Sequence, residues 1–465
     1  MKIPHRKQAA RASAAGRERS AAKRPPALAR LANAWWDRLI SSVVSGSLAD
    51  QTAQYAGHDQ TRDYMYNTAG LALWGGLFPI LTMICTHLVG AEQAGMFSMA
   101  FVIANLLQFV GLYGVRTFQV SDIDEMDSFG AYQIQRALAC LLMVAAGWLY
   151  FALRGYSGEM LSVCYATLLF RLADSLADVY EGRLQQFDKL WLAGVSQGVR
   201  CAGAIALFTV ALFLTRSITV ASIAMAVAGF ASLLLLAIPL AYFETPRSRR
   251  WAVVEVREVF VECFPAFAAQ FLFALIEAIP KFAMEGPLPY DDQLYFNAIY
   301  FPAQAILMAV GFMYKPQLVR LAKIWADPDG RKRFDLIVIA VIGAAALVTV
   351  VFLAIAAIIG IRITGLLYGL DFEPYRTQQY LMIVAGGMSA VVDFLYQIIT
   401  VLRRQEAVTK VYLVGLVVVS AVSFTMVRTV GFDGAVYGYL AVMAVLMVLM
   451  VIQYVNIRLH PVRTY

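Results

Sequence analysis

The run DLIVIAVIGAAALVTVVFLAIAAII, residues 335–359, decides the fold class. After its first residue, Asp335, the run contains no charged side chain. An α-helix rises about 1.5 Å per residue, so about 20 apolar residues cross the hydrocarbon core of a bilayer. Basic residues at 331–333 precede the run and Arg362 follows it. The pattern predicts a membrane-spanning helix.

Most of the chain repeats this pattern. Of its 465 residues, 60% are hydrophobic and only 15% are charged, and the mean hydropathy is +0.65. A soluble domain cannot cover so much apolar surface, and the charges fall mostly in short clusters between apolar runs. We therefore expect an all-α polytopic membrane protein with about 12 transmembrane helices. The predicted spans are 66–88, 95–115, 132–153, 159–180, 190–214, 218–243, 259–283, 293–314, 335–359, 377–401, 410–427 and 433–457.

Basic residues in the loops orient these spans. With the N-terminus inside, the inner segments hold 28 Lys and Arg residues. The outer loops then hold five: Arg154, Arg216, Arg362, Arg376 and Arg428. Cytoplasmic loops of membrane proteins are enriched in Lys and Arg, so both termini are expected in the cytoplasm. The acidic segment 118–130 is the one inner loop that does not support this orientation.

Weak internal similarity predicts two related halves. Residues 95–120 align with 294–319, and 172–186 align with the segment from Ala390 onward, which places Asp174 over Asp393. Since six helices is an even number, the second unit enters the membrane in the same orientation as the first. We expect a parallel repeat with a cleft between two six-helix lobes. The expected segments are a basic, disordered cytoplasmic tail (1–64), two lobes (65–245 and 246–458) and a short cytoplasmic tail (459–465).

Several kinds of chemistry have no motif in this sequence. It contains no G-x-x-x-x-G-K-[ST] phosphate loop, no H-E-x-x-H motif and no paired-cysteine metal site. Its five cysteines lie in or beside spans without zinc or redox spacing. The loops between spans leave no room for a catalytic domain. We expect a protein that is not an enzyme, with no catalytic residue, metal or cofactor and no nucleic-acid partner.

Span 159–180 and its inner end carry a charged stripe. Arg171, Asp174, Asp178 and Glu181 are spaced by 3, 4 and 3 residues, which puts them on one helical face. An ionisable group inside a membrane costs about 2.5–3.5 kcal/mol and therefore faces protein or water. Two interpretations stay open: an ion or proton relay along a cavity wall, or a structural salt-bridge ladder with Arg200 as an added partner.

Two further spans carry charges at depth. Glu277 and Lys281 are one turn apart around Pro280, so they are expected to pair along one face of a helix that can kink. The pair suits a gate beside a cleft; alternatively, Lys281 extends to the outer surface. Asp393, the repeat partner of Asp174, has either a functional or a hydrogen-bonding role.

Uncharged amides form a third set. Asn105, Asn297 and Gln304 either line a substrate cavity or join helices through hydrogen bonds. Arg116 and Lys315 lie at the inner ends of their spans, where positive-inside anchoring is the expected role.

Three segments resemble the polysaccharide and lipid-linked oligosaccharide flippases of the MOP exporter superfamily, relatives of the MATE drug exporters. HLVGAEQAGMFSMAFVIANLLQFVGLYGVRT (87–117) looks like the family's first outer loop and second helix. LADVYEGRLQQFDKLWLAGVSQGVR (176–200) is similar to its fourth-to-fifth helix junction, and LLYGLDFEPYRTQQYLMIVAGG (366–387) looks like its loop before helix ten.

The resemblance implies an alternating-access flippase in the inner (plasma) membrane. Such a protein moves a polyprenyl-pyrophosphate-linked oligosaccharide to the outer leaflet, beside a polymerase and other polysaccharide assembly proteins. Helices one, two, seven and eight line the cleft in this fold, and basic cavity residues often bind the pyrophosphate. Lys281, Arg171 and Arg200 are the residues able to do so here, and Lys281 would exchange Glu277 for a phosphate.

Three alternatives remain. A MATE-type cation- or proton-coupled drug exporter needs acidic residues to dominate the cavity, and we expect a cavity rich in Lys and Arg instead. A membrane enzyme needs a large loop that the chain lacks. The third alternative is a non-transporting subunit of a polysaccharide assembly machine.

Overall fold

The computed structural model describes residues 56–122, 125–314, 318, 321, 324–325, 331–402 and 404–459. The chain divides at residue 62, and the account below concerns the compact unit Asp63–Tyr465. Lys315, almost all of the predicted tail 1–64 and most of the tail 459–465 lie outside the described residues.

Twelve helices in the described part of the chain are long and apolar enough to cross a membrane, and each coincides with a predicted span. In the first half they are α3 (Ala56–Val89), α4 (Ala91–Leu112) with α5 (Val115–Ser121), α6 (Phe129–Arg154), α7 (Gly158–Gln186), α8 (Leu190–Thr215), and α9 (Ile218–Ser232) with η2 (Leu233–Ala237) and α10 (Ile238–Glu244). In the second half they are α11 (Val253–Met284), α12 (Tyr290–Tyr314), α14 (Arg331–Ile355) with η5 (Ala356–Gly360) and α15 (Ile361–Tyr368), η6 (Glu373–Tyr375) with α16 (Arg376–Val401), α17 (Gln405–Val430) and α18 (Phe432–Leu459).

The division between α8 and α9 rests on very few residues. Arg216 adopts the left-handed conformation, with φ at 53°, and ends α8. The Ser217 hydroxyl then accepts the backbone N–H of Val220 and caps α9. A left-handed residue followed by a serine cap is an ordinary helix stop and start, so two residues suffice to reverse the chain.

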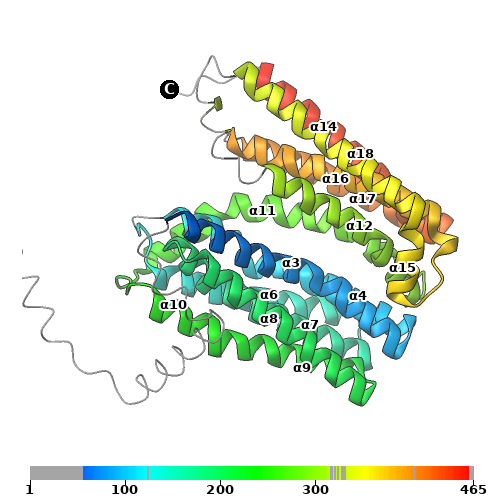
Figure 1. Cartoon of the computed structure of the whole chain (residues 1–465), viewed down its shortest axis with the longest axis horizontal. Helices are drawn as coiled ribbons and strands as arrows, with labels where there is room; N and C mark the ends of the chain where they lie inside the picture. The colour runs from blue at the N-terminus through cyan, green and yellow to red at the C-terminus, as the bar shows by residue number, and fades with distance from the viewer. Residues whose placement is uncertain are drawn as a thin grey trace, which may run out of the picture. The chain divides into compact units, whose positions relative to one another are not determined.

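The two halves repeat one packing order (Figure 1). In the N-half, which we define as α3 to α10, α4 packs on α7, α7 on α9 and α8 on α9. In the C-half, α11 to α18, the corresponding pairs are α12 on α16, α16 on α18 and α17 on α18. This correspondence is the one expected of a parallel repeat.

Helix α11 does not belong cleanly to one half. It packs against α17 and α18 of the C-half, and also against α4 and α6 of the N-half. Pro265 and Pro280 both lie inside it. The lobe boundary at residues 245–246 therefore stays a prediction.

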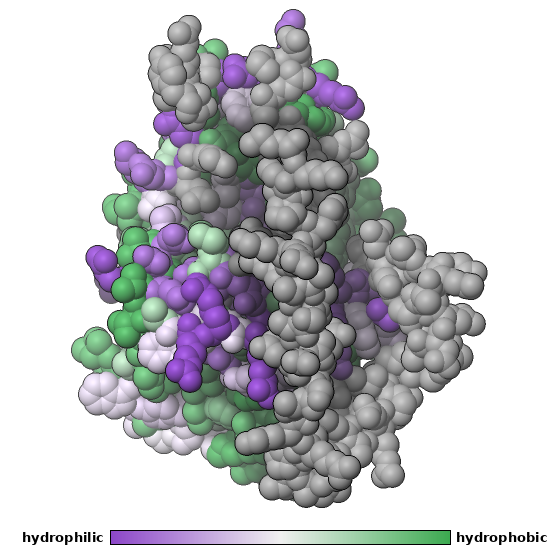
Figure 2. All heavy atoms as spheres, turned by 90° about the vertical axis from the view of Figure 1, so that its left-hand side faces the viewer, coloured by the Kyte–Doolittle hydropathy of each residue, from purple (hydrophilic) through white to green (hydrophobic). Residues whose placement is uncertain are grey.

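Polar residues gather at one end of the bundle, which we call the basic end. The loop after α10 carries Arg247 and Arg250 there, and the turn before α17 carries Arg404. Figure 2 looks at this end and shows hydrophilic side chains collected on it. The other end, which we call the opposite end, carries the loops after α3, α6, α8, α11, α15 and α17.

Candidate functional site

A cavity of about 460 Å³ lies between the two halves. Helices α3 and α4 form its N-half wall, and α11, α12, α16 and α17 form its C-half wall. Five predicted site residues meet here from four helices. They are Asn105, Glu277, Lys281, Gln304 and Asp393. The other polar lining side chains are Trp74, Gln108, Gln270, Tyr300, Tyr396, Gln397 and Tyr412.

Asn297 is the one substrate-cavity candidate that does not line this space. It is buried on α12, and its side-chain amide donates to the Gln293 carbonyl oxygen at 2.8 Å. Asn297 lies two turns before Gln304, nearer the opposite end. Its contact is within its own helix.

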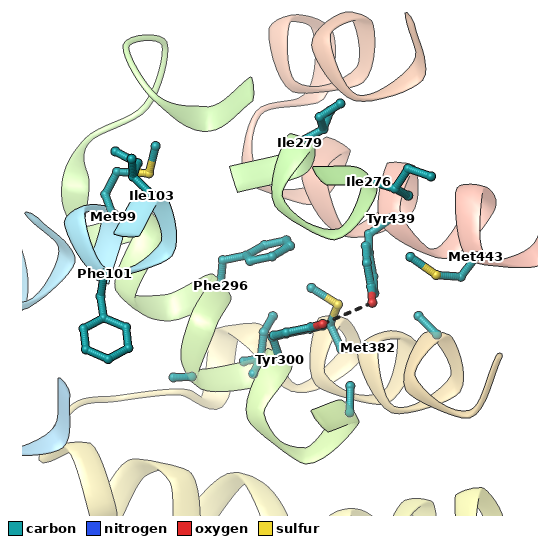
Figure 3. Packing of buried hydrophobic residues seen from close by; sticks show 14 of the residues in the cluster. Met99, Phe101, Ile103, Ile276, Ile279, Phe296, Tyr300, Met382, Tyr439 and Met443 are labelled. Carbon is teal, nitrogen blue, oxygen red and sulfur yellow. Dashed lines mark hydrogen bonds between the residues drawn. The ribbon is translucent and has the colours of Figure 1, made fainter. Parts of the chain in front are cut away.

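Glu277 is held by neutral hydroxyl groups of the C-half. Tyr300 and Ser389 each donate to its Oε1 at 3.1 Å, and the Tyr439 hydroxyl lies 3.4 Å from the same atom. Figure 3 shows Tyr300 and Tyr439 pointing toward one another, with their hydroxyl oxygens 3.4 Å apart. Tyr300 and Tyr439 are uncharged residues within apolar spans, so nothing in the sequence singled them out as partners of Glu277. The carboxylate is thus fixed in the C-half by α12, α16 and α18.

Lys281 does not form the predicted ion pair with Glu277. No contact within 4.0 Å joins their charged atoms among the described residues. The Lys281 ammonium lies 4.4 Å from the centre of the Tyr300 ring, a cation–π contact, while the Glu277 carboxylate turns to the three hydroxyls. Lys281 is 7% exposed, so its side chain does not extend to a membrane surface. Tyr300 touches both charges and leaves the ammonium beside the cavity.

The charged stripe of α7 forms a closed network in the N-half. Arg200 joins two acids: its Nε donates to Asp174 at 2.8 Å and its NH1 to Glu181 at 2.7 Å. Asp174 also accepts from Arg171 at 3.1 Å, from Gln108 at 2.7 Å and from Trp74 at 3.0 Å. Gln108 and Trp74 line the cavity, so this buried network positions one of its walls.

Asp178 binds two further arginines. Arg116 and Arg136 each donate to it at 2.7 Å, and Arg136 also donates to the Gly111 carbonyl oxygen. Arg116 is therefore an ion-pair partner of Asp178, and its expected role as a positive-inside anchor stays a prediction. Arg136 was overlooked, although an arginine inside predicted span 132–153 is the same signal that singled out Arg171. Every acid of the stripe contacts an arginine, which favours the ladder over the relay.

The expectation of a cavity rich in Lys and Arg was wrong. Among the described residues, the charged side chains that line it are Glu277, Lys281 and Asp393. Arg171 and Arg200 turn to the acids of their own half instead. Asp393 accepts from the Tyr314 hydroxyl at 2.6 Å. Helical spacing shows which residues lie on the same face of a helix, but not what that face contacts. The sequence alone therefore could not predict whether the net charge of the cavity is positive or negative.

Contacts between the halves close the opposite end. Glu285, just after α11, accepts hydrogen bonds from Arg154 at the end of α6 and from Tyr156 in the next loop. A Cβ atom added at Gly95 would lie 1.9 Å from the Tyr290 carbonyl oxygen, so the first turns of α4 and α12 meet through backbone. We call the Arg154–Glu285–Tyr156 cluster the latch.

Breaking the latch should populate a form that is open at the opposite end. Glu285→Gln removes an ion pair whose acid is 6% exposed, and we expect a shift in the conformational equilibrium of about fivefold to thirtyfold, or about 1–2 kcal/mol. Spin labels on Glu159→Cys and Asp371→Cys would report it as a larger population of long distances. The five native cysteines are buried and should stay unlabelled.

The matched control for the latch is Arg376→Gln. It removes the Arg376–Glu373 pair at the same end, but within the C-half and on one stretch of chain. Its distance distribution should equal that of the parent protein. Equal distributions for Glu285→Gln and Arg376→Gln would show that the latch does not hold the halves together.

No family model and no curated protein matches this chain, but solved structures do. It superposes with a TM-score of 0.65 and 13% identity on an inward-facing MATE family multidrug transporter of the MOP superfamily, covering 83% of this chain and 95% of that one. An outward-facing structure of a MATE family multidrug transporter of the MOP superfamily gives a TM-score of 0.59 and 12% identity, covering 86% of this chain and 96% of that one.

A third similar structure is a MOP superfamily transporter from Pyrococcus furiosus Vc1, described as having a binding pocket of reverse polarity that suggests a different function. It gives a TM-score of 0.54 and 13% identity, covering 86% of this chain and 95% of that one. The likeness spans nearly all of the described spans. The chain is an integral membrane protein with the twelve-helix fold of the MATE transporters of the MOP superfamily.

Proposed function

We propose that this protein is an alternating-access flippase. Its substrate would be a polyprenyl-pyrophosphate-linked oligosaccharide, a repeat unit of a cell-surface polysaccharide, moved from the inner to the outer leaflet. The protein would work as a transporter and not as an enzyme, next to the polymerase and other assembly proteins that use its product. The membrane would be the cell's inner (plasma) membrane.

The observation that carries this proposal is the amide and aromatic lining of the cavity. Asn105 and Gln108 offer amides from the N-half, and Gln270, Gln304 and Gln397 offer them from the C-half. An amide both donates and accepts hydrogen bonds, as each sugar hydroxyl does. Trp74, Tyr396 and Tyr412 add flat apolar surfaces against which sugar rings can lie. Such a lining suits a polyhydroxylated ligand better than a hydrophobic drug.

Lys281 supplies the positive charge that the pyrophosphate requires. Its ammonium rests against the Tyr300 ring, with no acid among the described residues within 4.0 Å. A diphosphate oxygen could therefore replace the ring as its partner without breaking an ion pair. Glu277, which accepts hydrogen bonds from the Tyr300 and Ser389 hydroxyls, is the candidate for a coupling proton or cation.

The orientation follows from the charges. We propose that the basic end and both termini face the cytoplasm. The closed latch and the superposition on an inward-facing transporter fit a state that loads from that side. An anionic headgroup that leaves a negative cytoplasm gains about 2.3 kcal/mol per charge per 100 mV, which supplies a driving force without ATP.

A cation exporter is the second candidate, because one observation favours it. The cavity's charged lining in the described part of the chain has two acids and one base. A net negative cavity attracts cations. The test below separates the two candidates.

The experiment deletes the gene and measures polyprenyl-linked oligosaccharides in extracted lipids by mass spectrometry. The expected result is accumulation of carrier-linked repeat units, which the wild-type gene reverses. An unchanged carrier pool together with greater sensitivity to cationic drugs would replace the flippase with the cation exporter.

A further inference from the structure

A second cavity, of about 840 Å³, is larger than the one between the halves. It lies at the basic end within the C-half, where α11, α16, α17 and α18 meet. Its mouth carries Arg404, Glu406 and Lys410. We call this space the C-half groove.

The groove combines a polar mouth with an apolar wall. Lys410 and Val414 lie one turn apart on α17, with Lys410 nearer the basic end. Gln453 and Leu449 repeat this arrangement on α18, again with the polar residue nearer the basic end. A ligand with a charged head and a hydrocarbon tail matches both parts at once.

The described side chains at the mouth have a net positive charge, and its basic groups are not paired with described acids. Arg404 and Lys410 outnumber Glu406, and neither basic side chain forms an ion pair with a described residue. Basic pockets between transmembrane helices at a headgroup level bind lipid phosphates. The complementary ligand is therefore an anionic lipid head.

The groove reaches the apolar outer face of the bundle and shares helices with the central cavity. Val414 is 55% exposed on the apolar outer face of α17, so a lipid can reach the groove without leaving the bilayer. On the other side, Thr400 of the groove is three residues from Gln397 of the central cavity, and Val411 is next to Tyr412. The groove and the central cavity therefore share α11, α16 and α17 as walls.

We propose that the C-half groove is a loading site for the diphosphate head of the lipid-linked substrate. Arg404 and Lys410 bind the phosphates while the prenyl tail follows Val414 and Leu449, before the head moves to the central cavity. This inference rests on the proposed flippase function and adds to it a first binding site outside the central cavity.

The test measures binding of farnesyl diphosphate to the full-length protein in phosphatidylcholine nanodiscs. Arg404→Gln with Lys410→Gln should weaken the affinity about thirtyfold, since each basic group near a lipid head contributes about a factor of five. Leu449→Trp, which fills the apolar wall and keeps both charges, should also weaken binding. The matched control is Arg247→Gln with Arg250→Gln, two exposed arginines at the same end, which should bind as the parent does.

Competing ligands distinguish the sources of the phosphate. Pyrophosphate and farnesol should each bind at least tenfold more weakly than farnesyl diphosphate, because each lacks half of the ligand. Displacement by phosphatidylglycerol at equal concentration would overturn the proposal in favour of a general anionic-lipid site. Equal affinity of parent and Arg404/Lys410 variant would also overturn it. Binding is measured without transport, so an unchanged carrier pool in the deletion strain tests the flippase separately.

Discussion

Arg200→Leu should leave almost no folded protein in the membrane. Arg200 is 1% exposed and holds both Asp174 and Glu181, so its loss leaves two buried carboxylates short of a cation. Removing one partner from a buried ion pair costs about 3–5 kcal/mol, and here two acids lose the same partner. Such a loss is of the same order as the whole stability of an ordinary domain. The measurement is the yield and melting temperature of a fluorescent fusion on size exclusion.

Two further variants make this prediction specific. Arg200→Lys keeps the charge, but one ammonium cannot span two carboxylates as a guanidinium fork does, so its melting temperature should fall between parent and Arg200→Leu. Arg250→Gln removes an exposed arginine and should match the parent. If Arg200→Leu melts within a few degrees of the parent, the α7 network does not stabilise the N-half.

The membrane spans could be predicted from the sequence because the physical cause of the pattern is local. A bilayer requires about 20 apolar residues in a row whatever surrounds them, so all twelve spans could be predicted. The division between α8 and α9 had the weakest signal, because only two residues separate these helices. The same rule singled out Glu277, Lys281 and Asp174, because a charge at depth stands out against hydrocarbon.

Which side chains pair with one another could not be predicted from the sequence, because the pairing depends on how the helices face one another. Arg116 was expected to anchor at the membrane surface, yet Asp178 on α7 lies beside it and binds it. Glu277 and Lys281 have ideal spacing for a pair, but Tyr300, from another helix, interposes its ring and hydroxyl. One helix fixes which residues share a face, and only the packed bundle fixes what that face meets.

The balance of charge in the cavity makes Lys281 the residue whose change best separates the two candidate functions. Lys281→Gln keeps a polar side chain while removing its charge. A charged hydrogen bond is worth about 1.5–3 kcal/mol, so export of a diphosphate-linked sugar should fall about tenfold to hundredfold. For a cation exporter we expect the opposite effect: cation export should not fall. The cavity then keeps Glu277 and Asp393 with no opposing base among its described lining residues.

The readout is the carrier-linked repeat units that remain in the deletion strain after complementation, alongside its tolerance of cationic drugs. Protein abundance should not fall, because a neutral amide costs less to bury than an ammonium and no acid among the described residues lies within 4.0 Å of the Lys281 ammonium. Glu277→Gln serves as the opposite change on the same helix: it makes the cavity more positive and should impair a cation exporter first. Full complementation by Lys281→Gln, with normal drug tolerance, would remove Lys281 from the substrate path and leave the amides and aromatic rings of the described lining to hold the ligand.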